Sequence, residues 1–193
     1  MEPIDKIFEH LKESNLTMIG YNNQDELIKD EFISKLPHIE IFEFDSSFSV
    51  MSALNRTIRG KKIDSVLDGE CFSTADFVIV DLGNFDPPKS ENDGISWVSR
   101  SVSEFVGSMR KELIGTEYRL IILSPVTKPT SFLTGDIPSF RGGSRSVYMA
   151  DLVYVIEGRK INIVKNRFDG DNITISLDGL KDYKYICSYE NNN

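Results

Sequence analysis

Two hydrophobic patterns alternate along the first two-thirds of the chain. Apolar residues at helical spacing predict helices over residues 4–14, 25–36, 48–58 and 95–113. Short apolar runs between them predict strands over residues 16–20, 39–44, 77–82 and 119–123. The runs FVIVDL and RLIIL are apolar almost throughout, which is typical of strands buried on both faces at the centre of a parallel sheet.

The last third of the chain changes to a pattern of consecutive strands. We predict strands over residues 152–157, 160–166 and 173–177, with residues 183–188 as a candidate for one more. The turns between them contain Gly158 and Asp169-Gly170, which favours antiparallel hairpins. Residues 84–94 and the Pro/Gly/Ser-rich residues 126–146 are expected to be loops. The sequence therefore predicts an α/β fold with a mostly parallel central sheet and C-terminal antiparallel β-hairpins.

The second predicted helix illustrates how local detail is read from the pattern. Leu27, Ile28, Phe32 and other apolar residues recur at helical spacing, which predicts one buried face. Asp25 stands where an N-cap residue is expected to bond the first free backbone N–H groups.

Length and composition indicate one domain. The chain has 193 residues, of which 40% are hydrophobic, enough for one buried core. We divide it into an N-terminal helix (residues 1–14), a core (15–188) and a disordered tail (189–193). The N-terminus does not resemble a signal peptide and no apolar run reaches the length of a membrane span, so we expect a cytoplasmic protein without a membrane contact.

The charge and the few candidate ligands exclude several functions. The net charge of −8 argues against strong autonomous nucleic-acid binding. Basic residues do, however, outnumber acidic ones by six to three within residues 138–170. Cys71 and Cys187 are expected to be unpaired thiols, and His10 and His38 lack metal-ligand spacing, so we predict neither a metal site nor a cofactor.

The order of elements resembles the RecA-like ATPase core shared by RecA recombinases and DnaB-type helicases, which implies a three-layer RecA-like fold. That family carries Gly-x-x-x-x-Gly-Lys-Ser/Thr after its first strand to bind phosphate. In this chain Gly20 stands at the first glycine, but Asp25, Glu26 and Leu27 replace the second glycine, the lysine and the hydroxyl residue. A local interpretation stays open, in which Gly20 ends a strand and the two acids favour the helix N-terminus.

Two further places in the resemblance depart from an active enzyme. The family ends a strand with an Asp that reaches magnesium through water, and Asp81 stands there in FVIVD. No Glu follows the second strand, where the catalytic glutamate is expected, and only Asp45 is acidic there. Ser124 or Pro125 stands where a polar sensor residue, often Gln, is expected. If Asp81 is a relic, Asp81→Asn should change stability by less than about 1 kcal/mol.

The run FRGGSRSVYMADLVYVIEGRKINIVKNRFDG carries the most specific part of the resemblance. In DnaB-type domains such a Gly/Ser/Arg loop faces DNA, and a later Lys-x-Arg pair points at the nucleotide of a neighbouring subunit. By that resemblance, Arg141, Arg145, Lys165 and Arg167 are expected to contact nucleic acid or a partner's nucleotide. The alternative is a solvated basic hairpin tip.

These patterns favour a pseudo-ATPase, a RecA/DnaB-like paralogue that binds or assembles in DNA replication, recombination or repair. Its expected partners are a RecA-like or helicase subunit, a second copy of itself, or single-stranded DNA bound weakly. The alternative is an interaction scaffold or inhibitor that caps a helicase or recombinase without contacting nucleic acid. An enzyme of another kind is the least favoured interpretation, because no constellation of catalytic residues is evident.

Overall fold

The computed structural model describes residues 3–36, 39–43, 77–83, 94–117, 119–127, 139–141, 143–168 and 174–178. Within them, five consecutive strands of the sheet run parallel, in the order β2-β3-β4-β1-β6, and β7 and β8 extend it as antiparallel neighbours. The short β5 pairs with β4 off this path. The strands are β1 (Leu16–Tyr21), β2 (Ile39–Glu43), β3 (Phe77–Asp81), β4 (Leu120–Thr127), β5 (Ser139–Phe140), β6 (Leu152–Glu157), β7 (Lys160–Asn166) and β8 (Thr174–Ser176).

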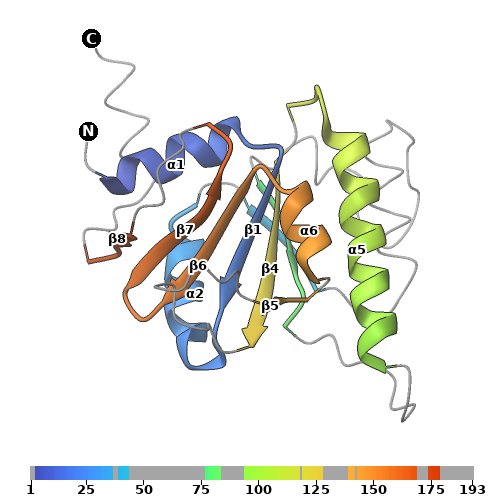
Figure 1. The fold of residues 1–193 in the computed structure, drawn as a ribbon. Helices are drawn as coiled ribbons and strands as arrows, with labels where there is room; N and C mark the ends of the chain where they lie inside the picture. The colour runs from blue at the N-terminus through green and yellow to red at the C-terminus, as the bar shows by residue number, and fades with distance from the viewer. Residues whose placement is uncertain are drawn as a thin grey trace.

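Helices cover both faces of this sheet (Figure 1). One layer holds α1 (Pro3–Glu13) and α2 (Glu26–Ser34), the latter preceded by a 3₁₀ turn, η1 (Asn23–Asp25). The other holds α5 (Gly94–Leu113) and α6 (Gly143–Met149). The strands alternate between the two cores, as the period of two requires: on β6, Val153 and Val155 face α5 and α6, whereas Tyr154 and Ile156 face α1 and α2.

The structure confirms the α/β fold class and the change to antiparallel hairpins. The predicted strands 152–157 and 160–166 coincide with β6 and β7. The helices predicted over residues 4–14, 25–36 and 95–113 and the remaining strands lie within a few residues of those observed. The predicted helix over residues 48–58, the strand over 183–188, the tail, most of the loop over 84–94, Asp45, Cys71 and Cys187 lie outside the described residues.

Two boundaries were predicted wrongly around the fourth parallel strand. β4 continues through Ser124 and Pro125 to Thr127, so these residues lie inside a strand and do not follow it. The segment predicted as a loop over residues 126–146 also contains β5 and the start of α6. Pro125 is tolerated because it lies near the strand's carboxyl end, opposite Tyr21, the last residue of β1.

The predicted face and cap of the second helix also need correction. Leu27 is 82% exposed, whereas Lys29 is buried beside Phe32 and Ile33. Asp25 makes no capping hydrogen bond, and its carboxylate instead accepts one from the backbone N–H of Gly158 at 3.0 Å. The η1 turn sets where α2 begins, and thereby turns Lys29 inward and Leu27 outward.

Candidate functional site

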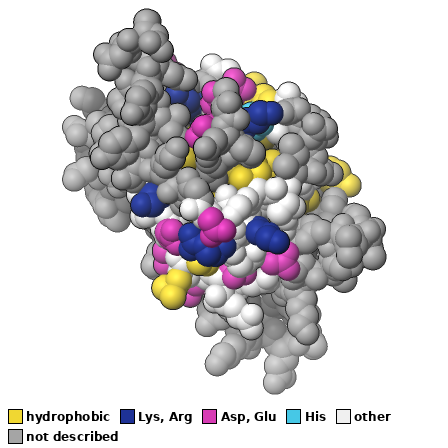
Figure 2. Space-filling model, turned by 90° about the vertical axis from the view of Figure 1, so that its left-hand side faces the viewer, with side chains coloured by type: hydrophobic (Ala, Val, Ile, Leu, Met, Phe, Trp, Pro, Cys, Tyr) yellow, Lys and Arg dark blue, Asp and Glu magenta, His cyan; other side chains and the backbone are white. Residues whose placement is uncertain are grey.

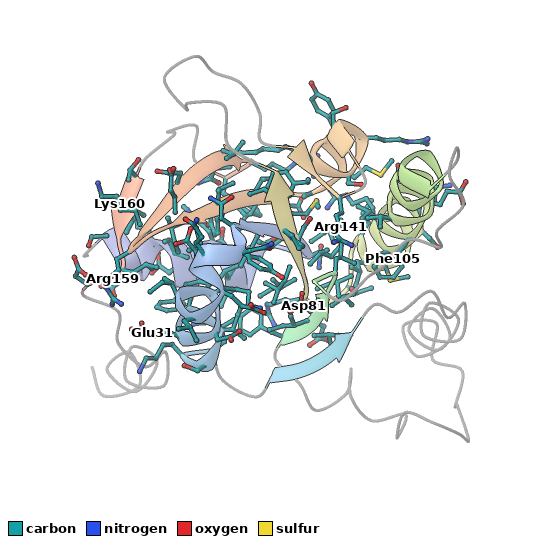
Figure 3. The ribbon with its side chains drawn as sticks, turned by 90° about the horizontal axis from the view of Figure 1, so that it is seen from below. Glu31, Asp81, Phe105, Arg141, Arg159 and Lys160 are labelled. Carbon is teal, nitrogen blue, oxygen red and sulfur yellow. The ribbon has the colours of Figure 1, made fainter. Side chains whose placement is uncertain are left out.

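The carboxyl ends of β1 and β3 bring together the polar cluster that we take as the candidate site. Parallel strands end at one edge of a sheet, where ligands bind in many open α/β folds. Here that edge holds Tyr21, the last residue of β1, and Asp81, the last residue of β3. Seen from below the sheet, Asp81 lies near the centre of this edge (Figure 3).

Asp81 accepts hydrogen bonds from three groups of its own chain. The hydroxyl of Tyr21 and the backbone N–H of Gly83 donate to Oδ1, at 3.3 and 2.8 Å. The ammonium of Lys29 donates to Oδ2 at 3.3 Å. A side chain at Gly83 would begin 2.6 Å from the Tyr21 hydroxyl oxygen, so glycine is needed for this close approach. The side chain of Asp81 remains 21% exposed.

Lys29 is the least expected member of the cluster. Its side chain is only 4% exposed, its ammonium also lies 3.2 Å from Oδ1 of Asp30, and it stands 4.5 Å from the centre of the Tyr21 ring. Burial lowers the pKa of Lys29, but Asp81 and Asp30 outweigh burial and raise it above its ordinary value. Burial, followed by the charge of Asp81, raises the pKa of Tyr21. Lys29 is therefore charged and Tyr21 neutral near pH 7.

The connection after β1, where a phosphate loop would lie, is short. Gly20 is inside β1, and a side chain there would begin 2.7 Å from Val126 and 2.8 Å from Phe140, so packing requires the glycine. The η1 turn follows at once, and the N–H of Asp25 donates to the carbonyl oxygen of Asn22 at 2.8 Å. Phosphate cradles use several convergent free N–H groups. In this turn one such group is already bonded, and Glu26 begins the next helix.

Arg141 lies at the same edge, next to Asp81 in the view of Figure 3. Its backbone N–H donates to the hydroxyl oxygen of Ser124 at 3.0 Å, which ties the end of β5 to β4. The positive charge of Arg141 also acts to lower the pKa of Tyr21, a smaller effect than burial. Arg141 thus brings a second cation towards the cluster.

Lys165 and Arg167 lie at the opposite edge, where the parallel strands begin. The ammonium of Lys165 donates to the carbonyl oxygens of Tyr148 and Ala150, at 2.7 and 2.6 Å, and so binds the C-terminal end of α6. Arg167 pairs with Asp151 at 2.7 Å. Burial and the neighbouring charge of Arg167 lower the pKa of Lys165.

Asp151 is the centre of this second cluster. Its other oxygen accepts a hydrogen bond from Arg110 of α5 at 2.6 Å and a longer one from the N–H of Leu16 at 3.4 Å. Arg145 is exposed on α6. The four predicted contact residues therefore do not form one surface: Arg141 lies beside Asp81, while Lys165 and Arg167 lie at the opposite edge.

Sequence reasoning did not find Lys29 and Tyr21. A signal for Lys29 was present, because it precedes Phe32 and Ile33 by three and four residues and so shares their buried face. A lysine on such a face needs a buried anion, and Asp81 is the acid that ends a nearby strand. Tyr21 gave no comparable signal, because its role depends on the length of β1.

Comparisons with known proteins give a limited answer. No protein-family model matches the chain, and no curated protein is similar to it in sequence. Among solved structures, the ATPase domain of a DnaB-like protein is similar at 14% identity and a TM-score of 0.43, over 88% of this chain and 82% of that one. The RadB recombinase is similar at 9% identity and a TM-score of 0.47, over 83% and 84%. Likenesses at this level do not assign a family. In the described part of the chain, no helix is long and apolar enough to cross a membrane.

Proposed function

We propose that the chain is a RecA/DnaB-like subunit that neither binds ATP tightly nor hydrolyses it, and that acts by assembly in DNA replication, recombination or repair. The observation that carries this proposal is the pairing of Asp81 with Lys29. In the resemblance, Asp81 is the residue that would reach magnesium. Here its oxygens are engaged by Lys29, Tyr21 and Gly83 of the same chain.

Electrostatics at the adjoining turn support the same proposal. Asp25 and Glu26 stand where the family has a glycine and a lysine, and Asp30 is exposed one turn later. A carboxylate about 4 Å from a phosphate charge is repelled by about 4 kcal/mol at the dielectric of a protein surface. The cations at this edge, Lys29 and Arg141, do not lie on the turn itself, and Lys29 already neutralises Asp81.

The test is a phosphate-release assay on the full chain with ATP and magnesium, with and without single-stranded DNA. We expect no release above the rate of a buffer control. Release that persists through purification, and that disappears in the Asp81→Asn variant, would overturn the proposal. Pull-down of a RecA-like ATPase from a defined mixture with the purified chain tests the assembly role separately.

A scaffold that contacts no nucleic acid is the second candidate, and two observations favour it. The net charge is −8. Lys165 and Arg167, the expected contact pair, are engaged with α6 and Asp151. Fluorescence anisotropy with a labelled single strand discriminates between the candidates. Binding with a dissociation constant near 1 µM to 100 µM that weakens steeply with salt supports DNA contact, as in other non-specific complexes.

A single substitution sharpens this assay without disturbing the fold. Arg145 is exposed, whereas Lys165 and Arg167 brace the structure, so their removal would confuse binding with stability. If Arg145 touches a phosphate, Arg145→Ala should reduce the slope of log affinity against log salt by about 1. Unchanged binding in this variant, or no binding by the parent chain, favours the scaffold.

A further inference from the structure

Two exposed surfaces of opposite chemistry lie at opposite ends of the molecule. The first, the α6–β7 surface, consists of Arg145 and Tyr148 on α6 and Arg167 and Phe168 after β7. Tyr148 is 68% exposed and the side chain of Arg167 is 54% exposed. Aromatic and arginine side chains together are the residues that most often dominate the binding energy of protein interfaces.

Internal contacts hold the α6–β7 surface in one arrangement. Lys165 joins the end of β7 to the last carbonyl groups of α6, among them that of Tyr148. Arg167 is anchored by Asp151, and the ring of Phe168 stacks on His10 with centroids 6.1 Å apart. A surface already fixed in this way loses little side-chain entropy when a partner binds.

The α6–β7 surface is locally positive although the chain is negative overall. Three cations, Arg110, Lys165 and Arg167, surround a single described carboxylate, that of Asp151. The charges of Arg167 and Arg110 act to lower the pKa of Lys165, which agrees with a positive potential there. The surface is therefore suited to an apolar group rimmed by carboxylates.

The chain carries such a group on the other side. The α2 surface consists of Leu27, 82% exposed, flanked by Glu26 and Asp30. Glu31 lies one turn after Leu27 but is already paired with Arg159. Arg159 and Asp178 continue this mixed face, where basic side chains lie among acidic ones (Figure 2). Leu27 with Glu26 and Asp30 thus offers an aliphatic anchor with an acidic rim.

We propose that the α2 surface of one copy docks on the α6–β7 surface of a second copy. The α2 surface lies at the carboxyl edge on the layer of α1 and α2, and the α6–β7 surface lies at the amino edge beside α6. One copy therefore cannot join its own two surfaces. In the dimer, Leu27 lies against Tyr148, and guanidinium groups of Arg145 and Arg167 meet the carboxylates of Glu26 and Asp30.

Such a contact is head-to-tail, so each dimer keeps one free surface of each kind. Association therefore continues to rings or filaments of increasing size. This proposal deepens the assembly role proposed above, yet it requires no nucleotide, so its test is independent of ATP binding.

Sedimentation velocity tests the contact. The parent chain should form species larger than a dimer as its concentration rises to about 100 µM, between the millimolar and micromolar affinities of weak contacts. Leu27→Glu and Tyr148→Glu should each weaken association at least about 30-fold. Ile114→Glu, which changes an exposed apolar residue outside both surfaces, should behave as the parent chain.

Mixing the two variants decides the geometry. The Leu27→Glu chain keeps its α6–β7 surface and the Tyr148→Glu chain keeps its α2 surface, so the mixture should form a 1:1 dimer that grows no further. A monomeric parent chain, a mixture that stays monomeric while the parent associates, or equal loss in Ile114→Glu would each overturn the proposal. Failure here with no ATP binding leaves the pseudo-ATPase proposal intact, and the reverse result leaves this contact intact.

Discussion

Asp81 and Asp151 are two carboxylates at opposite edges of the sheet, each held by cations of its own chain. The contacts of Asp151 with Arg110 and Arg167 measure 2.6 and 2.7 Å, and its side chain is 6% exposed. The contacts of Asp81 with Lys29 and Tyr21 measure 3.3 Å, and it is 21% exposed. Asp151 is a structural clamp joining α5, β6 and β7, whereas Asp81 lies in a looser and more accessible cluster. A buried ion pair can therefore serve as a brace or can mark a former binding site, and its geometry distinguishes the two.

The largest effect is expected at Asp151. Asp151→Ala removes the shared partner of Arg110 and Arg167, so it should lower the free energy of unfolding by about 3–4 kcal/mol. Chemical denaturation measures this. Asp178→Ala, which removes an exposed partner of Arg159, is the matched control and should cost less than about 1 kcal/mol. If both cost the same, the clamp has no special role.

A smaller loss is expected at Lys29. Lys29→Met keeps the aliphatic packing but leaves Asp81 without its cation, and should cost about 2–3 kcal/mol because Asp81 retains some solvent. Lys111→Met, on an exposed lysine of α5, should stay within about 0.5 kcal/mol. Asp81→Asn should likewise cost more than the roughly 1 kcal/mol expected from the sequence alone, because Lys29 is left buried. A neutral Lys29→Met would mean that the pair contributes nothing to stability.

Alkaline pH should destabilise the Asp81 cluster. The pKa of Lys29 and that of Tyr21 are both raised above their ordinary values of 10.5 and 10.0. A raised folded-state pKa gives stability that is complete below the ordinary pKa and is lost as pH rises through the folded one. Unfolding free energy should therefore fall above about pH 10. Lys29→Met with Tyr21→Phe should flatten this dependence, and an equally steep fall in that variant would contradict the assignment.

The smallest effect is expected at a buried polar group with neither brace nor site. The hydroxyl of Tyr154 has no hydrogen-bond partner in the described structure, and the residue is fully buried against α1 and α2. Tyr154→Phe should leave stability unchanged or raise it by up to about 1 kcal/mol, since an unpaired buried hydroxyl costs free energy. Thermal melting measures it. A clear loss would indicate an internal partner such as water.

The sequence predicted the fold better than the site, for physical reasons. Hydrophobic periodicity is set locally, so β6, β7 and the central strands could be placed closely. The inward rotation of Lys29 depends on the η1 turn, and the meeting of Tyr21 with Asp81 depends on strand order, and neither is encoded by local spacing. Likewise the sequence identified Lys165 and Arg167 as a basic pair but could not show that α6 and Asp151 engage them.

The central claim is that the cluster around Asp81 leaves no place for a nucleotide. Isothermal titration calorimetry of the full chain with ATP and magnesium tests it most directly, with the Lys29→Met variant as comparison. We predict no binding tighter than about 1 mM by either chain, because Asp25 and Glu26 repel phosphate even when Lys29 is gone. Micromolar binding of magnesium-ATP by the parent chain would contradict the account.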